Sequence, residues 1–373
     1  MKILFSGERF LMPAGGAELS IRTLLEKLAK NHEVHAIFCG RENRDYKEGN
    51  IFLHQRKPPL ILSLLKSSPR QLLMNRWWPR VLDEFIDDSI DIIFTQQVLT
   101  PATVKTARRH NKKVVCFIRD YYPLCLTNPI IGCKGSCFKC IPFLKKLIYP
   151  ISVLMRRNHL NALKEADLVI ANAEYVSKFY ERLAGLKSKV VYPMVEAKFK
   201  QGRRGDHIGF VNKKGREKGI DVFMKIAKEL KRKYLLVGNT EAYEREIKNL
   251  PYIEYVKWTN DMQGEYSKME IMLVPSQWPD PSPRVCIEAM QIGLPVIASR
   301  VGGIPEVLGD AGIIVDDYTN PKAWIEAILG LESDEKLYAT LAERSIKQAE
   351  VLSVEKMFYR FKSIIREGLR IEL

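Results

Sequence analysis

The chain has 373 residues, which exceeds the usual size of one hydrophobic core, so the length predicts two domains of ordinary size. A content of 46% hydrophobic and 28% charged residues is typical of a soluble globular protein, and no apolar run is long enough to cross a bilayer. The first residues, MKILFSGERF, break their apolar run at Glu8 and Arg9, too soon for a signal-peptide core. With seven cysteines, too sparse for a disulfide scaffold, these features favour a cytoplasmic protein over a secreted or integral membrane protein.

The net charge of +15 has an uneven distribution, because two long stretches contain no acidic residue. One stretch runs from Arg56 to Leu82 and mixes basic residues with many leucines and the Trp77-Trp78 pair; the other runs from Tyr121 to Lys164. Basic side chains interleaved with Leu and Trp are typical of a segment that lies on an anionic membrane surface. The alternative is a solvated basic face that covers an ordinary amphipathic helix.

The first half of the chain alternates strand and helix patterns. A strand at Ile3–Ser6, a Gly-Gly loop, an amphipathic helix from about Ala17 to Lys30 and a strand at Glu33–Phe38 make a βαβ unit. Further strands are predicted at DIIFTQ, KVVCFIRD, DLVIANA and KVVYPMV, with helical patterns between several of them. This order predicts a parallel sheet with crossover helices.

A second alternating series begins at HIGFVN and continues through KYLLVGN, YIEYVKW, IMLVPS, PVIAS and GIIVD. The join lies between Tyr192 and His207, where the pattern gives way to Pro, Gly and charge. We therefore predict an α/β fold with two Rossmann-like, doubly wound domains, residues 1–195 and 196–353, which face a central cleft. The closing helical pattern, residues 354–373, is predicted to pack back on the N-terminal domain. GERFLMPAGGAE follows the first strand in place of a Gly-x-Gly-x-x-Gly turn, which disfavours a dehydrogenase.

The segment WPDPSPRVCIEAM contains a helix start signal after the strand IMLVPS. A Ser followed by a Pro predicts a helix that begins at Pro283 with Ser282 as its N-cap. The backbone amides of Arg284 and Val285 then have no partner inside the helix, and such a terminus binds anions, phosphate above all.

Two acids flank this helix start, eight residues apart. Glu288 lies one turn into the predicted helix and can accept hydrogen bonds from a ribose diol. Asp280 precedes the helix and can accept hydrogen bonds from the hydroxyls of a sugar. The order sugar, diphosphate and ribose is that of a nucleotide-sugar. The alternative is that Asp280 shapes a loop and that Glu288 is an exposed helix acid.

The segments after the second acid complete a pattern: Glu288-Ala289-Met290 is followed by Gly293-Leu294-Pro295-Val296 and by Gly302-Gly303-Ile304-Pro305-Glu306. Together with Asp280, this set resembles the donor-site signature of the retaining family-4 glycosyltransferases of the GT-B fold. The resemblance extends over nearly the whole chain, through PAGGAE, ADLVIANAEYV, VVYPMVEAKF and EKGIDVF. It implies a nucleotide-sugar-dependent hexosyltransferase that retains the anomeric configuration and needs no metal.

The resemblance implies a role for each matching residue. Glu288 corresponds to the acid that holds the ribose, and Asp280, where the family usually has Glu, to the acid that contacts the donor sugar. Lys218, in the Lys218-Gly219 pair, would stabilise the leaving diphosphate. Asn212 stands where the family has Arg, so it can donate a hydrogen bond but brings no charge. Other cations of the loop would compensate: Lys213, Lys214 or Arg216.

Further donor and acceptor contacts are expected elsewhere. Gly15 and Gly16 allow the backbone to approach a ligand closely, and the resemblance implies that this loop faces the donor phosphate or the acceptor. The base is expected near Lys257–Thr259, which includes Trp258. Arg119 and Asp120 stand where the family commonly has His-Asp, on the acceptor or sugar side. No separate nucleophile or general base stands out, which fits the front-face, leaving-group-assisted mechanism of the family.

A cysteine cluster does not belong to this pattern. Cys125, Cys133, Cys137 and Cys140 lie within sixteen residues, and four thiols in one loop can ligate zinc or an iron–sulfur cluster. Free thiols or redox-dependent disulfides are the alternatives, because only one C-x2-C pair is present.

The sequence as a whole predicts a glycosyltransferase that moves a sugar from a nucleotide-sugar donor to a glycan or lipid-linked acceptor in polysaccharide biosynthesis, with no required cofactor. It is expected in the cytoplasm, with peripheral contact to an anionic membrane surface and no specific nucleic acid partner. Two alternatives remain: a donor-binding homologue without transferase activity, since Asn212, Asp280 and Arg119 depart from the family pattern, and a basic membrane or nucleic-acid adaptor.

Overall fold

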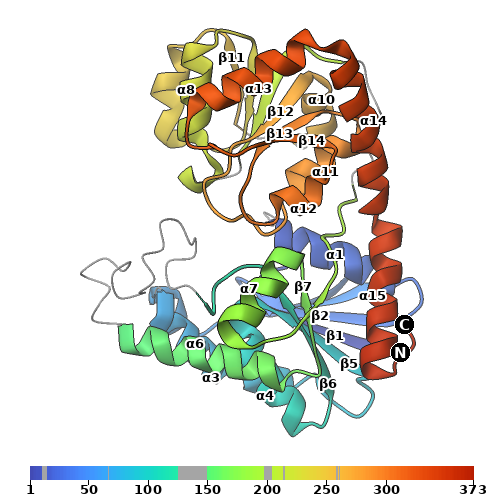
Figure 1. Ribbon diagram of the computed structural model, residues 1–373. Helices are drawn as coiled ribbons and strands as arrows, with labels where there is room; N and C mark the ends of the chain where they lie inside the picture. The colour runs from blue at the N-terminus through green and yellow to red at the C-terminus, as the bar shows by residue number, and fades with distance from the viewer. Residues whose placement is uncertain are drawn as a thin grey trace. The chain divides into compact units, whose positions relative to one another are not determined.

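The computed structural model describes residues 1–10, 15–65, 67–124, 149–196, 204–212, 215–257, 259 and 261–373. These residues form two compact units. Unit 1 comprises Met1–Met194 together with Met357–Leu373, and unit 2 comprises Val195–Lys356. Each unit is a twisted sheet with helices packed on its faces (Figure 1). No helix in these described ranges is long and apolar enough to span a bilayer.

Unit 1 contains an eight-stranded sheet in the order β3-β4-β2-β1-β5-β6-β7-β8. All neighbouring strands are parallel except β3 and β4, which form a hairpin around Gly49, a residue with φ of 58°. The polar sequence RDYKE of β3 hid this edge strand from the sequence analysis. The strands are β1 (Lys2–Gly7), β2 (Glu33–Cys39), β3 (Arg44–Glu48), β4 (Ile51–Arg56), β5 (Ile92–Gln96), β6 (Lys113–Ile118), β7 (Leu168–Ala171) and β8 (Lys189–Val190).

The helices of unit 1 cover this sheet and include the C-terminal helix. Phe361 of that helix, α15, is fully buried and stacks on Phe117 with ring centroids 6.2 Å apart. The Arg360 side chain donates to the carbonyl of Val190 at 2.7 Å, so α15 is fixed on the sheet by both apolar and polar contacts. The described helices are α1 (Gly16–Leu28), α2 (Leu60–Leu64), α3 (Ser67–Asp83), η1 (Gln97–Leu99), α4 (Thr100–Arg109), α6 (Tyr149–Glu165), α7 (Glu174–Ala184) and α15 (Val354–Leu369).

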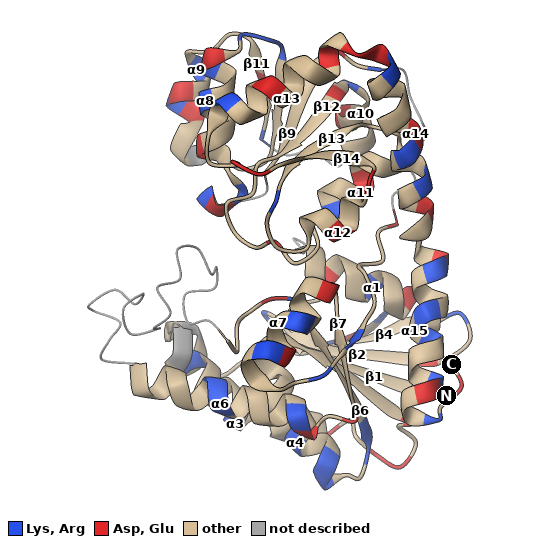
Figure 2. Ribbon diagram, in the orientation of Figure 1, with Lys and Arg blue, Asp and Glu red and all other residues tan. Residues whose placement is uncertain are grey.

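The tryptophan pair in α3 belongs to the core of unit 1. Trp78 is 0% exposed, and its indole N–H donates to the Ser6 hydroxyl at 2.8 Å. A buried indole whose N–H is satisfied inside the protein cannot also anchor a membrane interface. The expectation that this pair lies on a membrane is therefore wrong for Trp78. Arg76 and Arg80 of the same helix are exposed, and Figure 2 shows further basic residues along the helices of unit 1.

Unit 2 contains a six-stranded sheet in the order β11-β10-β9-β12-β13-β14, in which every pair is parallel. Its core includes Phe210 stacked on Phe223 and the fully buried Trp324. The strands are β9 (His207–Val211), β10 (Tyr234–Val237), β11 (Ile253–Val256), β12 (Met269–Val274), β13 (Val296–Ser299) and β14 (Gly312–Val315). The helices are η3 (Arg216–Lys218), α8 (Ile220–Glu229), η4 (Glu241–Tyr243), α9 (Glu244–Lys248), α10 (Met262–Ser267), α11 (Arg284–Gln291), α12 (Ile304–Leu308), α13 (Pro321–Ser333) and α14 (Glu335–Val351). Both units thus have the doubly wound arrangement that the alternating patterns predicted.

Candidate functional site

The sheet order of unit 2 indicates where a ligand would bind, namely at the carboxyl ends of its two central strands. Strands β9 and β12 are neighbours at the centre of the sheet, and the chain proceeds from β9 to one side and from β12 to the other. Ligands of doubly wound sheets bind beyond the carboxyl ends of the strands at such a switch point. The segments that follow β9 and β12 carry the residues that the sequence analysis selected.

The segment after β9 begins with Asn212. This residue is 2% exposed, and its side-chain amide donates to the carbonyl of Gly215 at 3.5 Å. Among the described residues its side-chain oxygen has no hydrogen-bond partner. Gly219 closes the segment with φ of 88°, and a Cβ there would lie 1.7 Å from the carbonyl oxygen of Pro275. The absence of a side chain therefore lets the Lys218 loop lie directly against the end of β12.

The Arg216 side chain is directed to Tyr243 and Asp221 rather than to the Lys218–Asp280 region at the carboxyl ends of β9 and β12. Its side chain donates to the hydroxyl of Tyr243 at 3.0 Å and lies 3.7 Å from Asp221, and it is largely exposed. The other cations proposed to compensate for Asn212, Lys213 and Lys214, lie outside the described residues. Lys218 is consequently the cation that the described part of this loop presents to the site.

The loop after β12 packs against the Gly302-Gly303 motif. The Gly303 amide donates to the carbonyl of Asp280 at 2.8 Å. A Cβ at Gly302 would lie 2.4 Å from that carbonyl oxygen, and one at Gly303 would lie 1.8 Å from the carbonyl oxygen of Pro281. Glycine at both positions therefore allows two backbone segments to pack in contact, which sets the position of Asp280.

Asp280 and Lys218 form an ion pair across the switch point. The Lys218 ammonium donates to the Asp280 carboxylate and lies 5.1 Å from the centre of the Trp278 ring. The Asp280 side chain is 7% exposed, whereas that of Lys218 is 36% exposed. Trp278, which the sequence analysis did not select, therefore contributes a cation–π contact to the pair.

Helix α11 begins one residue later than predicted. Pro283 has an extended ψ of 111° and is the N-cap, so the helix starts at Arg284 and no side chain caps it. The prediction that Ser282 is the N-cap is wrong, because it lies one residue too far from the first turn. Its hydroxyl is buried and has no hydrogen-bond partner among the described residues. Arg284 and Val285 are the first two residues of α11, and the anion site expected at their amides stays a prediction.

Glu288 is held in place from two sides. The Tyr266 hydroxyl donates to one carboxylate oxygen at 2.9 Å, and the Arg284 guanidinium lies 3.5 Å from the other. Tyr266 is fully buried, and this burial, reinforced by Glu288, raises the pKa of its hydroxyl well above the usual value. Burial lowers the pKa of Arg284, which Glu288 partly offsets. The carboxylate is thus oriented by a neutral hydroxyl donor and a cation.

The carboxylates of Asp280 and Glu288 both act on the pKa of one buried thiol, that of Cys286. Cys286 is fully buried, and burial raises the pKa of its thiol; Asp280 and Glu288 raise the pKa further, and Lys218 lowers it. The structure therefore brings Lys218, Asp280 and Glu288 to the same end of α11. Tyr266 has no motif in the sequence, and only its hydrogen bond to Glu288 identifies it.

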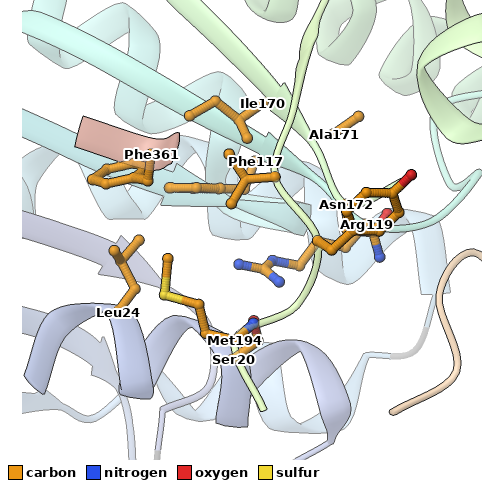
Figure 3. Close-up of a pocket in the computed structure, with 11 residues that line it drawn as sticks. Ser20, Leu24, Phe117, Arg119, Ile170, Ala171, Asn172, Met194 and Phe361 are labelled. Atoms are coloured by element: carbon orange, nitrogen blue, oxygen red, sulfur yellow. The ribbon is translucent and has the colours of Figure 1, made fainter. Parts of the chain in front are cut away.

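The predicted residues of unit 1 lie at the ends of different elements. Gly15 is the N-cap of α1, which begins at Gly16. Arg119 follows β6, and Figure 3 shows its guanidinium directed into an interior pocket next to Phe117 and Met194. Asp120 accepts the amide of Tyr122 at 2.9 Å, and burial raises the pKa of its carboxyl. These four residues belong to unit 1, and the acid pair belongs to unit 2.

Several predicted residues lie outside the described part of the chain: Trp258 and the cluster Cys125, Cys133, Cys137 and Cys140. In the part that is described, no group of three or more His, Cys, Asp or Glu side chains is arranged to hold a metal ion.

The fold defines a protein of two α/β units, and the residues selected from the sequence motifs of unit 2 lie at the switch point of its sheet. Two family models match the chain: Glycosyltransferase Family 4 over residues 14–199 and Glycosyl transferases group 1 over residues 205–334. The chain therefore belongs to the family-4 glycosyltransferases of the GT-B fold, as the motifs predicted.

The chain is also similar to proteins with curated descriptions, one of which is described as a glycosyltransferase. An uncharacterized glycosyltransferase of Methanocaldococcus jannaschii is 25% identical over 96% of this chain and 98% of its own. A 42.6 kDa protein of the cps region of Klebsiella pneumoniae is 28% identical over 79% of this chain and 83% of its own. Spore coat protein SA of Bacillus subtilis is 38% identical, but the match spans 27% of each chain.

Solved structures support the fold. Sucrose-phosphate synthase of Thermosynechococcus elongatus superposes with a TM-score of 0.76 at 16% identity and covers 98% of both chains. HepE of Anabaena, solved in complex with UDP-glucose, superposes with a TM-score of 0.70 at 16% identity over 98% of this chain and 100% of its own. The predicted GT-B fold with two Rossmann-like domains is confirmed.

Proposed function

We propose that this glycosyltransferase moves a hexose from a nucleotide-sugar donor to a glycan or lipid-linked acceptor, with retention of configuration and without a metal. The observation that carries the proposal is the arrangement around α11 in unit 2. The N-terminus of α11, which no side chain caps, lies between two oriented carboxylates, Asp280 paired with Lys218 and Glu288 held by Tyr266.

The diphosphate is assigned to the start of α11. The amide end of a helix carries a partial positive charge, so the start of α11 suits a phosphate. The buried Ser282 hydroxyl has no partner among the described residues and can donate to the same anion. Lys218 adds a full positive charge from the β9 side, and such fixed donors stabilise charge that develops on a leaving group.

The ribose and the sugar are assigned to the two acids. A carboxylate oriented by Tyr266 and Arg284 accepts hydrogen bonds from a diol in a fixed geometry, which suits Glu288 to the ribose. Asp280, on the opposite side of the helix start, faces the position of the transferred sugar. Gly15, Gly16, Arg119 and Asp120 of unit 1 are proposed to contact the donor or the acceptor, as the family resemblance implies.

Retention and metal independence rest on the same geometry. The described site offers no second carboxylate placed as an independent general base, because each acid is committed to a hydroxyl or an ion-pair partner. Cationic and N–H groups rather than a divalent ion then meet the charge of the leaving diphosphate. Both features agree with the leaving-group-assisted mechanism that the family resemblance implies.

The acceptor and the cellular location are inferred from the relatives and from exposed apolar side chains of unit 1. The Klebsiella relative belongs to a cps region, and HepE of Anabaena binds UDP-glucose, which favours polysaccharide biosynthesis with a uridine donor. Leu60 and Leu64 of α2, which lie within the acid-free basic stretch from Arg56 to Leu82, are 76% and 74% exposed, as at an anionic bilayer surface. We therefore place the protein in the cytoplasm, in peripheral contact with a membrane that carries the acceptor.

A donor panel tests the proposal. A donor that binds the native state raises the melting temperature by mass action, so UDP- and GDP-sugars are compared at millimolar concentration. The stabilising donor should be transferred or slowly hydrolysed, with the product anomer assigned by NMR and with activity unchanged by EDTA. Glu288→Ala should abolish the shift, whereas Glu326→Ala, an exposed acid of α13, should preserve it. No stabilisation by any donor, or equal loss in both variants, contradicts the proposal.

A further inference from the structure

The carboxylate of Asp280 depends on one cation. Asp280 is 5% exposed, and in the described part of the chain Lys218 is the cation that pairs with it. A buried carboxylate is costly unless it is paired or hydrogen-bonded. Any ligand that attracts Lys218 away must therefore replace the pairing or leave an uncompensated charge.

The two partners differ in their freedom to move. The backbone of Asp280 is held by the Gly303 amide at 2.8 Å and by the close packing of Gly302, and its own side chain is short. Lys218 has a long flexible side chain that is 36% exposed. Its ammonium also lies over the ring of Trp278 at 5.1 Å, which can hold the cation as it turns. Of the two side chains, Lys218 is therefore the one with the greater freedom to move.

A diphosphate at the start of α11 competes with Asp280 for Lys218. A nucleoside diphosphate alone takes the cation and leaves Asp280 unpaired. An intact nucleotide-sugar takes the cation and also brings sugar hydroxyls that donate to the carboxylate that has lost its partner. The two ligands thus differ in whether they restore a partner to Asp280.

We propose that the Lys218–Asp280 pair is a latch that discriminates the intact donor from the nucleoside diphosphate product, an inference that rests on the proposed function. In transfer, the bond from the anomeric carbon to the diphosphate breaks and a bond to the acceptor oxygen forms, while the acceptor proton leaves on the diphosphate. The sugar hydroxyls depart with the product. Asp280 then regains Lys218, and the weakened hold on the diphosphate speeds its release. Trp278 is a positioning residue for the cation in this cycle.

Inorganic pyrophosphate tests the latch without knowledge of the base or sugar. Titration calorimetry compares the native protein with Asp280→Asn, Lys218→Met and the double variant, whose side chains keep similar volumes. Asp280→Asn should bind pyrophosphate about tenfold more tightly or better, because the competitor for Lys218 is removed. Lys218→Met should weaken binding more in the Asp280→Asn background than in the native protein, since only there is the cation free.

A matched control separates the latch from simple charge removal. Glu288→Gln removes one negative charge from the same site without releasing Lys218, so its gain should be several-fold smaller than that of Asp280→Asn. An equal gain in the two variants, unchanged pyrophosphate binding in Asp280→Asn, or additive effects in the double variant would overturn the latch. If Asp280→Asn does not fold, Asp280→Ser serves the same comparison.

The intact donor provides an arm with the opposite sign. Asp280→Asn should weaken binding of the nucleotide-sugar found in the donor panel while it tightens binding of the matching nucleoside diphosphate. A change of the same sign for both ligands contradicts the latch. If no nucleotide-sugar binds at all, the proposed function fails, and the pyrophosphate titration still decides whether the pair competes with a diphosphate.

Discussion

Tyr266→Phe isolates the contribution of one hydroxyl to ribose recognition. The hydroxyl donates to Glu288 at 2.9 Å, and its ring is fully buried, so the substitution removes one donor and leaves the packing intact. Because burial and Glu288 raise the pKa of Tyr266 well above its usual value, the hydroxyl stays protonated at neutral pH and acts as a donor. Sequence reasoning had no motif that pointed to this residue.

The expected magnitude follows from the surroundings of the carboxylate. A hydrogen bond to a charged group contributes about 1.5–3 kcal/mol. Glu288 keeps Arg284 at 3.5 Å and has a side chain that is 18% exposed, so water replaces part of the lost bond and the lower limit applies. A loss of about 1.5 kcal/mol corresponds to about tenfold weaker donor binding.

The assay compares two ligands that differ in whether they carry a ribose. Calorimetric titration with the nucleotide-sugar of the donor panel should show the tenfold loss in Tyr266→Phe, and titration with inorganic pyrophosphate should show no change. Equal losses for both ligands would mean that the substitution loosens the whole site. Unchanged donor binding would refute the assignment of Glu288 to the ribose.

Three further substitutions, two of them with a matched control, test packing and the burial of a titratable group. Gly303→Ala forces a Cβ to within 1.8 Å of a backbone oxygen and should lower the free energy of unfolding by about 2 kcal/mol or more. Gly330→Ala, in open space on α13, should raise it by up to about 1 kcal/mol; equal stability of the two variants in thermal unfolding would contradict the close-packing argument. Phe361→Ala should cost about 3–5 kcal/mol in urea denaturation and the 69% exposed Tyr359→Ala less than about 0.5 kcal/mol, so a small loss in the former would argue against α15 as a core element. Burial lowers the pKa of His159 to about 3, so below about pH 6.5 the unfolded chain binds a proton there that the folded chain does not. His159 therefore does not lower the free energy of unfolding above pH 6.5, and lowers it progressively toward pH 3, by about 1.4 kcal/mol at pH 5.5. His159→Leu should lack that part of the pH dependence of stability. An unchanged pH dependence in this variant would contradict the assignment to His159.

The motifs predicted most of the candidate site because they record local chemistry. The spacing of Asp280 and Glu288 around a helix start, and the Lys218-Gly219 pair, are short-range features, and each of these residues lies at the switch point of unit 2. The predicted start of α11 was wrong by one residue, because a proline is compatible with both the N-cap and the first helical position. The sequence identified Gly302-Gly303 only as part of the family signature. Its contact with the backbone of the Asp280 loop is visible only in the tertiary structure.

The sequence by itself determined the two doubly wound sheets, the helix start between the acids and the identity of the charged groups, because periodicity and turn chemistry act over a few residues. Only the tertiary structure decided which distant side chains meet. Trp78 carries the same amphipathic pattern whether it faces a membrane or a core, and its hydrogen bond to Ser6 across the fold decides the question. Tyr266 reaches Glu288, and Lys218 reaches Asp280, over 22 and 62 residues of chain, a separation that no local pattern records.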